Sequence, residues 1–254
     1  MTAAEPLGRK MMVSFSGIDG AGKSTQIANL CAHLHAAGKR VSIVTFWDDV
    51  ATLKSMREGA GHKIFKGDKG VGSPDAPIER RDKNVRSPLM TMVRLGLYFL
   101  DTLSLRRATR RVLRSESDVI IFDRYLYDEL ANLNFNRGIL RLYVRLLLRL
   151  VRRPDVSLVL DADPVEARKR KPEYPLDFLH ENREAYLRLA RVLGGFTVIP
   201  PLPLSEAKAA VVGAAMQRLP MASAQGETAS DGAAPSAMQP PMRVDEREAR
   251  PLAS

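Results

Sequence analysis

The 254-residue sequence has little of what builds disulfides or metal clusters. Its single cysteine, Cys31, excludes a disulfide within the chain and is typical of a reducing compartment. Its four histidines show no metal-binding pattern, because His33 and His35 stand two residues apart and so lie on different faces of a helix. We therefore expect neither a disulfide scaffold nor a metal cluster.

Long apolar runs are also missing. The best candidate for a membrane span, residues 139–151, is interrupted by three arginines. The first residues lack the apolar segment of a secretory signal. We expect a soluble, cytoplasmic protein.

Positive charge, by contrast, is in surplus, with a formal net charge of +10. Residues 220–254 carry three arginines and five acids, which leaves 36 basic and 24 acidic residues, a net charge of +12, for residues 1–219. A surplus of this size favours anionic partners, namely nucleotides, nucleic acid or a membrane surface.

Arg141, Arg145 and Arg149 recur every four residues and form one stripe on a helix. The stripe can contact anionic lipid or nucleic acid, or it can be the solvent side of an amphipathic helix whose leucines and valines are core. We favour the second interpretation, so membrane contact is not the expected role of this helix. Nucleic acid is not an expected partner either, because no basic groove rich in aromatic residues is present.

The order of apolar runs and helical patterns predicts an α/β fold. Strand and helix alternate from the start, and such a βαβ unit implies a parallel sheet with a right-handed crossover. Five strands are expected, at residues 10–16, 40–46, 119–122, 156–160 and 196–199. Helices are expected at residues 23–37, 89–114, 127–133, 139–153, 176–193 and 205–219.

Several segments differ from this regular pattern. Residues 1–9 are expected to form a flexible N-terminus, and residues 220–254, rich in Ala, Ser, Pro, Gln and Glu, a disordered tail. Residues 54–88 indicate a polar, mobile excursion over the substrate side. The basic, proline-interrupted residues 168–175 are a candidate lid within the main domain, residues 10–219.

The most informative stretch joins the first strand to the first helix. It contains the pattern G-x-x-x-x-G-K-[ST], with Gly17, Gly22, Lys23 and Ser24 at the required places. The glycines let backbone N–H groups approach a phosphate, and the helix N-terminus favours an anion. Lys23 can reach the β- and γ-phosphates, and the Ser24 hydroxyl can ligate Mg²⁺. The alternative is an ordinary glycine-rich turn.

A second site follows the third strand. Four apolar residues end in Asp123, a Walker B-like arrangement that directs a carboxylate toward the phosphates, where it can hold Mg²⁺. The alternative role for Asp123 is to cap the next helix. Arg124 is suited to a phosphate, although an ion pair with Asp123 or Asp128 would also explain it.

A third site contains Arg168 and Arg170, after the fourth strand. A basic flap can exclude water and neutralise the charge that builds on a transferred phosphoryl group. The alternative is a solvated cationic face of a helix. For Asp163 we favour a structural role, as the N-cap of a helix that has Pro164 at its first position and Glu166 two residues later.

These motifs together resemble the thymidylate kinases. Residues 17–26 are similar to the phosphate loop of that family, Asp123-Arg124-Tyr125 resembles its Asp-Arg-aromatic motif, and the segment with Arg168 and Arg170 resembles its lid. The order and spacing of the elements agree from about residue 10 to 218. The resemblance implies a P-loop NTPase three-layer fold, a five-stranded parallel sheet with helices on both faces.

The resemblance also implies roles for individual residues. ATP would be held by the loop, and Mg²⁺ by Ser24 and Asp123. Asp19 would lie toward the sugar and phosphate of the acceptor, and Arg124 would clamp the phosphates. Because the loop has Gly20-Ala21 and no arginine, the resemblance implies that Arg168 and Arg170 supply the catalytic cations. The residues expected to contact ATP are Gly17, Gly20, Ala21, Gly22, Lys23, Ser24 and Thr25.

The departures from the family concern the acceptor. Its members usually carry Arg-Glu-Pro-Gly after the second strand, where this chain has Phe-Trp-Asp-Asp-Val at residues 46–50. After Asp-Arg-aromatic they usually carry a serine pair, where this chain has Asp128 and Glu129. We therefore assign Trp47 and Asp128, with Asp19 and Arg124, to the acceptor site.

The expected function is an ATP- and Mg²⁺-dependent kinase that phosphorylates a nucleoside monophosphate, with dTMP as the default acceptor. One alternative is a related kinase that acts on an unphosphorylated nucleoside or another hydroxyl compound, since the added acids would repel a phosphorylated acceptor. The other is a non-catalytic ATP-binding module. The oligomeric state stays open, with a homodimer as one option.

Overall fold

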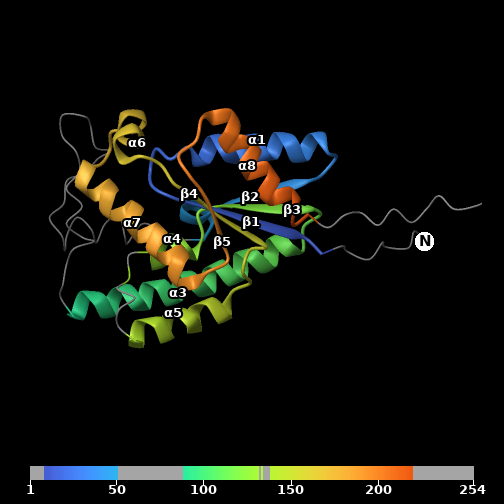
Figure 1. Ribbon diagram of the computed structural model, residues 1–254. Coiled ribbons are helices and arrows are strands. Elements are labelled where there is room, and N and C mark those ends of the chain that lie inside the picture. The colour runs from blue at the N-terminus through green and yellow to red at the C-terminus, as the bar shows by residue number, and fades with distance from the viewer. Residues whose placement is uncertain (1–8, 51–87, 132, 134–137, 220–254) are drawn as a thin grey trace, which may run out of the picture. The chain divides into compact units, whose positions relative to one another are not determined.

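The computed structural model describes residues 9–50, 88–131, 133 and 138–219 (Figure 1). The expected flexible N-terminus, the polar excursion and the C-terminal tail therefore lie outside the described residues, apart from Arg9 and Pro88.

Five parallel strands form one sheet in the order β2-β3-β1-β4-β5. β1 is central, and its Val13 pairs with Ile121 on one side and Val156 on the other. Every residue of β1 is buried, as predicted for a parallel strand covered on both faces. The strands span Met11–Ser16 (β1), Val41–Thr45 (β2), Val119–Asp123 (β3), Val156–Leu160 (β4) and Phe196–Ile199 (β5).

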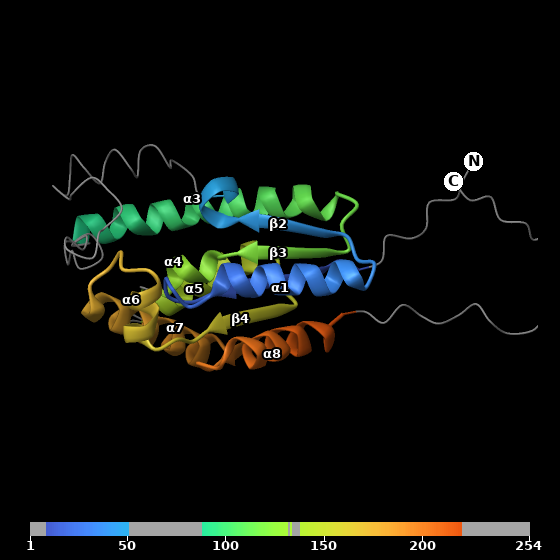
Figure 2. The same cartoon turned by 90° about the horizontal axis from the view of Figure 1, so that it is seen from above.

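Helices cover both faces of the sheet, which confirms the predicted α/β P-loop fold (Figures 1 and 2). One face is covered by α1 (Lys23–Ala36) and α8 (Leu204–Met216). The other is covered by α3 (Pro88–Leu113), α4 (Leu126–Leu130), α5 (Gly138–Leu150) and α7 (Leu176–Leu193).

The alternation of side chains along the strands divides the core in two. Met11, Val13 and Phe15 of β1 pack with apolar residues of α1 and α8. Met12, between them, faces the opposite layer and packs with residues of α3, α4, α5 and α7. The sheet is therefore fixed from both sides, and its carboxyl-terminal edge is left to position the site.

The predicted N-cap is confirmed, because the Asp163 carboxylate accepts hydrogen bonds from the backbone of Val165 and Glu166 at the start of α6 (Pro164–Arg170). The basic segment 168–175 therefore begins inside this helix. One strand boundary differs from the prediction. The second strand ends before Phe46, where a short π-helical turn, η1 (Phe46–Val50), begins. No helix in the described part of the chain has the length and apolar character needed to cross a bilayer.

Candidate active site

The phosphate loop leaves the carboxyl end of β1 and passes close to two neighbouring backbones. A Cβ on Gly17 would lie 2.4 Å from the carbonyl oxygen of Leu160, and one on Gly20 would lie 2.2 Å from that of Ala167. Both glycines have positive φ, at 141° and 81°. Glycine is therefore required at both positions, and the loop is held against β4 and α6. Figure 2 shows α6 beside the start of α1, on the side toward which the strands point.

Lys23 begins α1, and its ammonium lies inside the loop. The Nζ atom donates to the carbonyl oxygens of Gly17 at 2.9 Å and Ile18 at 2.8 Å, and the side chain is buried. Burial, with the nearby charge of Arg124, lowers the pKa of Lys23 to about 8. The two carbonyl dipoles stabilise the buried ammonium only in part. A bound anion would stabilise its positive charge further.

Asp19 lies at the centre of a cluster of cations. Its Oδ1 atom is 2.5 Å from Nη2 of Arg124 and 3.8 Å from Nζ of Lys171. Burial alone would raise the pKa of Asp19, but Arg124, Lys23 and Lys171 together hold it below its ordinary value. Among the described residues, Arg124 is the one non-glycine with a positive φ, 70°. The guanidinium reaches the phosphate loop through its contact with Asp19.

Asp128 contacts the other terminal nitrogen of the Arg124 guanidinium. Its carboxylate is buried and accepts hydrogen bonds from Ser16 Oγ at 2.7 Å, Tyr186 Oη at 2.7 Å and the Tyr125 backbone N–H at 3.1 Å. Nη1 of Arg124 lies 3.7 Å from Oδ1 of Asp128. The ion pair suggested by the sequence for Arg124 thus exists with Asp128, and a stronger one is made with Asp19 in the loop.

Asp123 and Ser24 have the chemistry that Mg²⁺ requires. Asp123 ends β3 beside Phe15 of β1, and it is close enough to Lys23 to raise that pKa against the effect of burial. The Ser24 and Thr25 side chains are exposed on the first turn of α1. No group of three acids, histidines or cysteines forms a complete metal site within the described residues. A divalent cation would therefore depend on phosphate oxygens and water for its other ligands.

Trp47 lies on η1, beyond the carboxyl end of β2. Its ring packs edge-on against Phe46, with 5.6 Å between the ring centroids, and the side chain is partly exposed. Asp49 accepts a hydrogen bond from the backbone N–H of Thr45, so this acid stabilises the turn. Trp47 shares the carboxyl-terminal edge of the sheet with Asp19 and Arg124.

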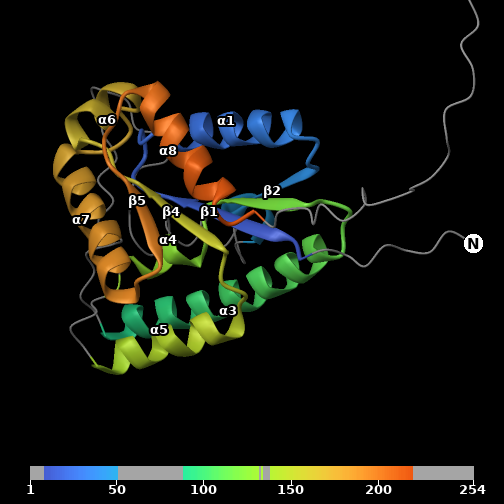
Figure 3. The same ribbon diagram turned by 45° about the vertical axis from the view of Figure 1, so that its right-hand side comes forward.

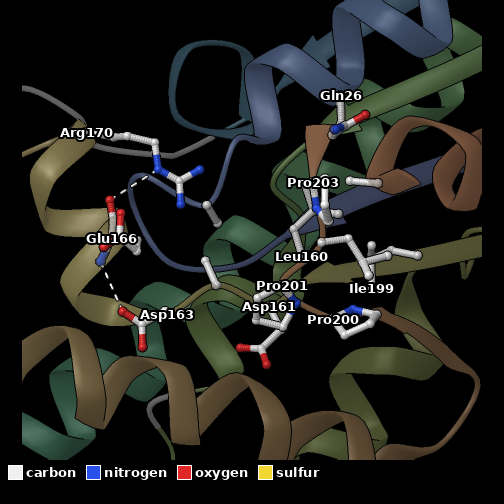
Figure 4. A pocket seen from close by; sticks show the side chains of 14 residues that line it. Gln26, Leu160, Asp161, Asp163, Glu166, Arg170, Ile199, Pro200, Pro201 and Pro203 are labelled. Atoms are coloured by element: carbon white, nitrogen blue, oxygen red, sulfur yellow. Dashed lines mark hydrogen bonds between the residues drawn. The ribbon is translucent and has the colours of Figure 1, made fainter. Parts of the chain in front are cut away.

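A cavity of about 300 Å³ lies beside the loop. Arg170 lines it, with its Nε donating to the carbonyl oxygen of Glu166 (Figure 4). Arg168, two residues away on α6, is not part of the lining. The structure therefore separates the two predicted lid arginines. The other lining residues come from the loop, α1, the end of β4 and the turn after it, α6, the end of β5 and the segment after it, and α8: Ala21, Gln26, Leu160, Asp161, Ala162, Asp163, Glu166, Ile199, Pro200, Pro201, Leu202, Pro203 and Ala207.

Two residues of this site were missed by the sequence analysis. Lys171 stands inside the candidate lid but not among its proposed catalytic cations, although it is the lid residue that contacts Asp19. Tyr186 lies in the middle of α7 and has the sequence signature of a core aromatic residue. Its contact with Asp128 spans 58 residues and has no local signal.

The parallel sheet, the glycine loop at the end of its central strand and the buried Lys23 define a P-loop NTPase. A family model described as methylmalonyl Co-A mutase-associated GTPase MeaB matches residues 1–52, which include this loop.

Curated relatives that match most of the chain are thymidylate kinases. The thymidylate kinase of Chlorobium chlorochromatii (strain CaD3) is 30% identical over 182 residues, which cover 69% of this chain and 72% of the relative. The probable thymidylate kinase of Methanosphaera stadtmanae is 26% identical over 200 residues, 77% of this chain and 92% of the relative. The thymidylate kinase of Bifidobacterium longum (strain DJO10A) is 28% identical over 190 residues, which cover 71% of this chain and 84% of the relative. The chain belongs to the thymidylate kinase family.

Proposed function

We propose that this protein is a Mg²⁺- and ATP-dependent kinase that transfers the γ-phosphoryl group to a nucleoside monophosphate, with dTMP as the first acceptor to test. The observation that carries the proposal is the convergence of three cations, Lys23, Arg124 and Lys171, on the single carboxylate of Asp19. Three cationic side chains gathered beside the phosphate loop are suited to phosphate groups, although Asp128 and Glu173 also contact Arg124 and Lys171. The names of the relatives supply the substrate class.

The chain's own residues would act mainly by positioning and by stabilising charge. The loop amides and Lys23 would hold the donor phosphates, and Arg124 and Lys171 would face the acceptor from either side of Asp19. Arg170, in the wall of the cavity, would add positive charge beside the donor. Mg²⁺, held by Ser24 and Asp123, would neutralise charge on the β- and γ-phosphates. The acceptor oxygen would attack phosphorus in line with the departing ADP oxygen, without a covalent enzyme intermediate.

A second acceptor class, an unphosphorylated nucleoside or another hydroxyl compound, is favoured by one specific observation. Arg124, the side chain expected to clamp an acceptor phosphate, contacts carboxylates on both sides, Asp19 at 2.5 Å and Asp128 at 3.7 Å. A guanidinium compensated in this way attracts an anion less strongly. Asp128 is also fixed by its three hydrogen bonds, so it cannot turn away without breaking them.

ADP release tests the function and separates the two acceptor classes. The full-length protein is incubated with Mg²⁺ and ATP plus dTMP, other monophosphates, nucleosides or sugars. Stimulation by a monophosphate supports the first proposal, and stimulation by nucleosides or sugars alone supports the second. Lys23→Ala should lower turnover about 100-fold or more. Lys208→Ala, a matched loss of one exposed lysine on α8, should leave it unchanged. ATP binding without stimulation by any acceptor would indicate a non-catalytic ATP-binding module.

A further inference from the structure

α5 exposes a row of apolar side chains that the core does not use. Four residues on its inner side are buried: Leu140, Val144, Leu147 and Leu148. On its outer side, Ile139, Leu142 and Leu146 are 76%, 66% and 51% exposed. Their spacing places them in one row along the helix. The interpretation favoured by the sequence, an amphipathic helix with a core side and a charged solvent side, does not account for this second apolar row.

The arginine stripe runs beside the exposed apolar row. Arg141, Arg145 and Arg149 are all exposed, and α5 contains no acidic residue. Within the part of the chain that the structure describes, no acidic side chain forms an ion pair with any of the three. Their charge is therefore available to a partner.

The neighbouring helix has the same sign of charge. α3 lies beside α5 in two views, and Tyr143 of α5 donates a hydrogen bond to the carbonyl oxygen of Leu95 (Figures 1 and 3). α3 carries five arginines and one acid, Asp101, which is buried. α3 and α5 are therefore both strongly cationic, within residues 1–219 whose net charge is +12.

We propose that the outer face of α5 lies on an anionic phospholipid surface. Apolar residues in one row and arginines in the next are the arrangement of an interfacial helix, whose apolar row enters the acyl boundary while its cations meet lipid phosphates. A second copy of this chain is a poorer occupant, because a two-fold contact would bring the same arginine stripe against itself. The proposal concerns where the protein is held and does not depend on the proposed kinase activity.

Vesicle co-sedimentation of the full-length protein tests the proposal. We expect binding to vesicles that contain phosphatidylglycerol and none to phosphatidylcholine alone. Replacing the three arginines of α5 by glutamine should weaken binding about 100-fold, because each basic residue at a membrane surface typically contributes about fivefold. The double variant Leu142→Asn/Leu146→Asn should also weaken it, and since both side chains are exposed it should fold normally.

A matched control removes three exposed arginines elsewhere, with Arg188→Gln, Arg191→Gln and Arg218→Gln, and should bind as the unmodified protein does. The proposal is wrong if the anionic vesicles bind nothing at low salt, or if the control loses as much affinity as the α5 variant. It is also wrong if light scattering shows a dimer that the leucine double variant converts to monomer while vesicle binding is absent, because a second copy then covers the face.

Discussion

Replacing Tyr186 by phenylalanine removes one hydroxyl from the buried centre of the site and leaves the ring in place. The hydroxyl donates to Oδ1 of Asp128 at 2.7 Å, and both side chains are buried. It stays protonated because burial and the charge of Asp128 raise its pKa. A hydrogen bond to a charged group contributes about 1.5–3 kcal/mol, so the free energy of unfolding should fall by about 2 kcal/mol.

Tyr125→Phe is the matched control, since Tyr125 is also buried and its hydroxyl donates to the neutral carbonyl oxygen of Arg152. A neutral hydrogen bond contributes about 1 kcal/mol, so Tyr125→Phe should lower the free energy of unfolding about half as much as Tyr186→Phe does. Guanidinium unfolding, with equal m-values for all variants, gives the comparison.

The reasoning about Asp128 is refuted if the two variants cost the same, or if Tyr186→Phe costs less than about 0.5 kcal/mol. An Asp128→Asn background adds a second check, because the cost of Tyr186→Phe should shrink when the acceptor of its hydrogen bond carries no charge. In catalysis, Tyr186→Phe should raise the KM for the acceptor more than Tyr125→Phe does, since Asp128 also contacts Arg124.

Three further changes test separate parts of the site. Burial lowers the pKa of Lys23 to about 8, so ATP affinity measured by calorimetry should fall as the pH rises above 8, where the amine becomes neutral; constant affinity there would contradict this. Gly20→Ala should lower the free energy of unfolding by about 1–2 kcal/mol or more, because Gly20 has a positive φ. It should also weaken ATP binding, because the new Cβ would meet the Ala167 carbonyl. Gly138→Ala is the control and should be tolerated, since its Cβ meets open space. Asp163→Ala removes the cap of α6 and should lower the free energy of unfolding by about 1 kcal/mol in denaturant titrations; no change would show that the cap is dispensable.

The phosphate loop and the sheet were predictable because their signals are local. A G-x-x-x-x-G-K-S pattern after an apolar run defines a strand, a loop and a helix within a few residues, and the structure places Lys23 at the start of α1 as predicted. Val156–Leu160 and Phe196–Ile199 were predicted with the boundaries that the structure shows, since apolar runs between polar turns are clear signals.

The arrangement around Arg124 was only partly predictable. As an alternative to phosphate binding, the sequence suggested an ion pair of Arg124 with Asp123 or Asp128, and the structure shows the pair with Asp128. The pairing of Arg124 with Asp19 crosses 105 residues of sequence and was not predicted. The positive φ of Arg124 has no sequence signal, because arginine is not a residue that favours that conformation. Such contacts are determined by how β1, β3 and α7 come together, which local patterns do not specify.

The measurement that tests the central claim most directly is ADP formation from ATP and Mg²⁺ by the full-length protein, with and without each acceptor of the panel. The account predicts that at least one nucleotide or hydroxyl acceptor stimulates ADP formation and that Lys23→Ala abolishes the stimulation while Lys208→Ala preserves it. Tight ATP binding with no stimulation by any acceptor, or full turnover by Lys23→Ala, would contradict the assignment as a kinase.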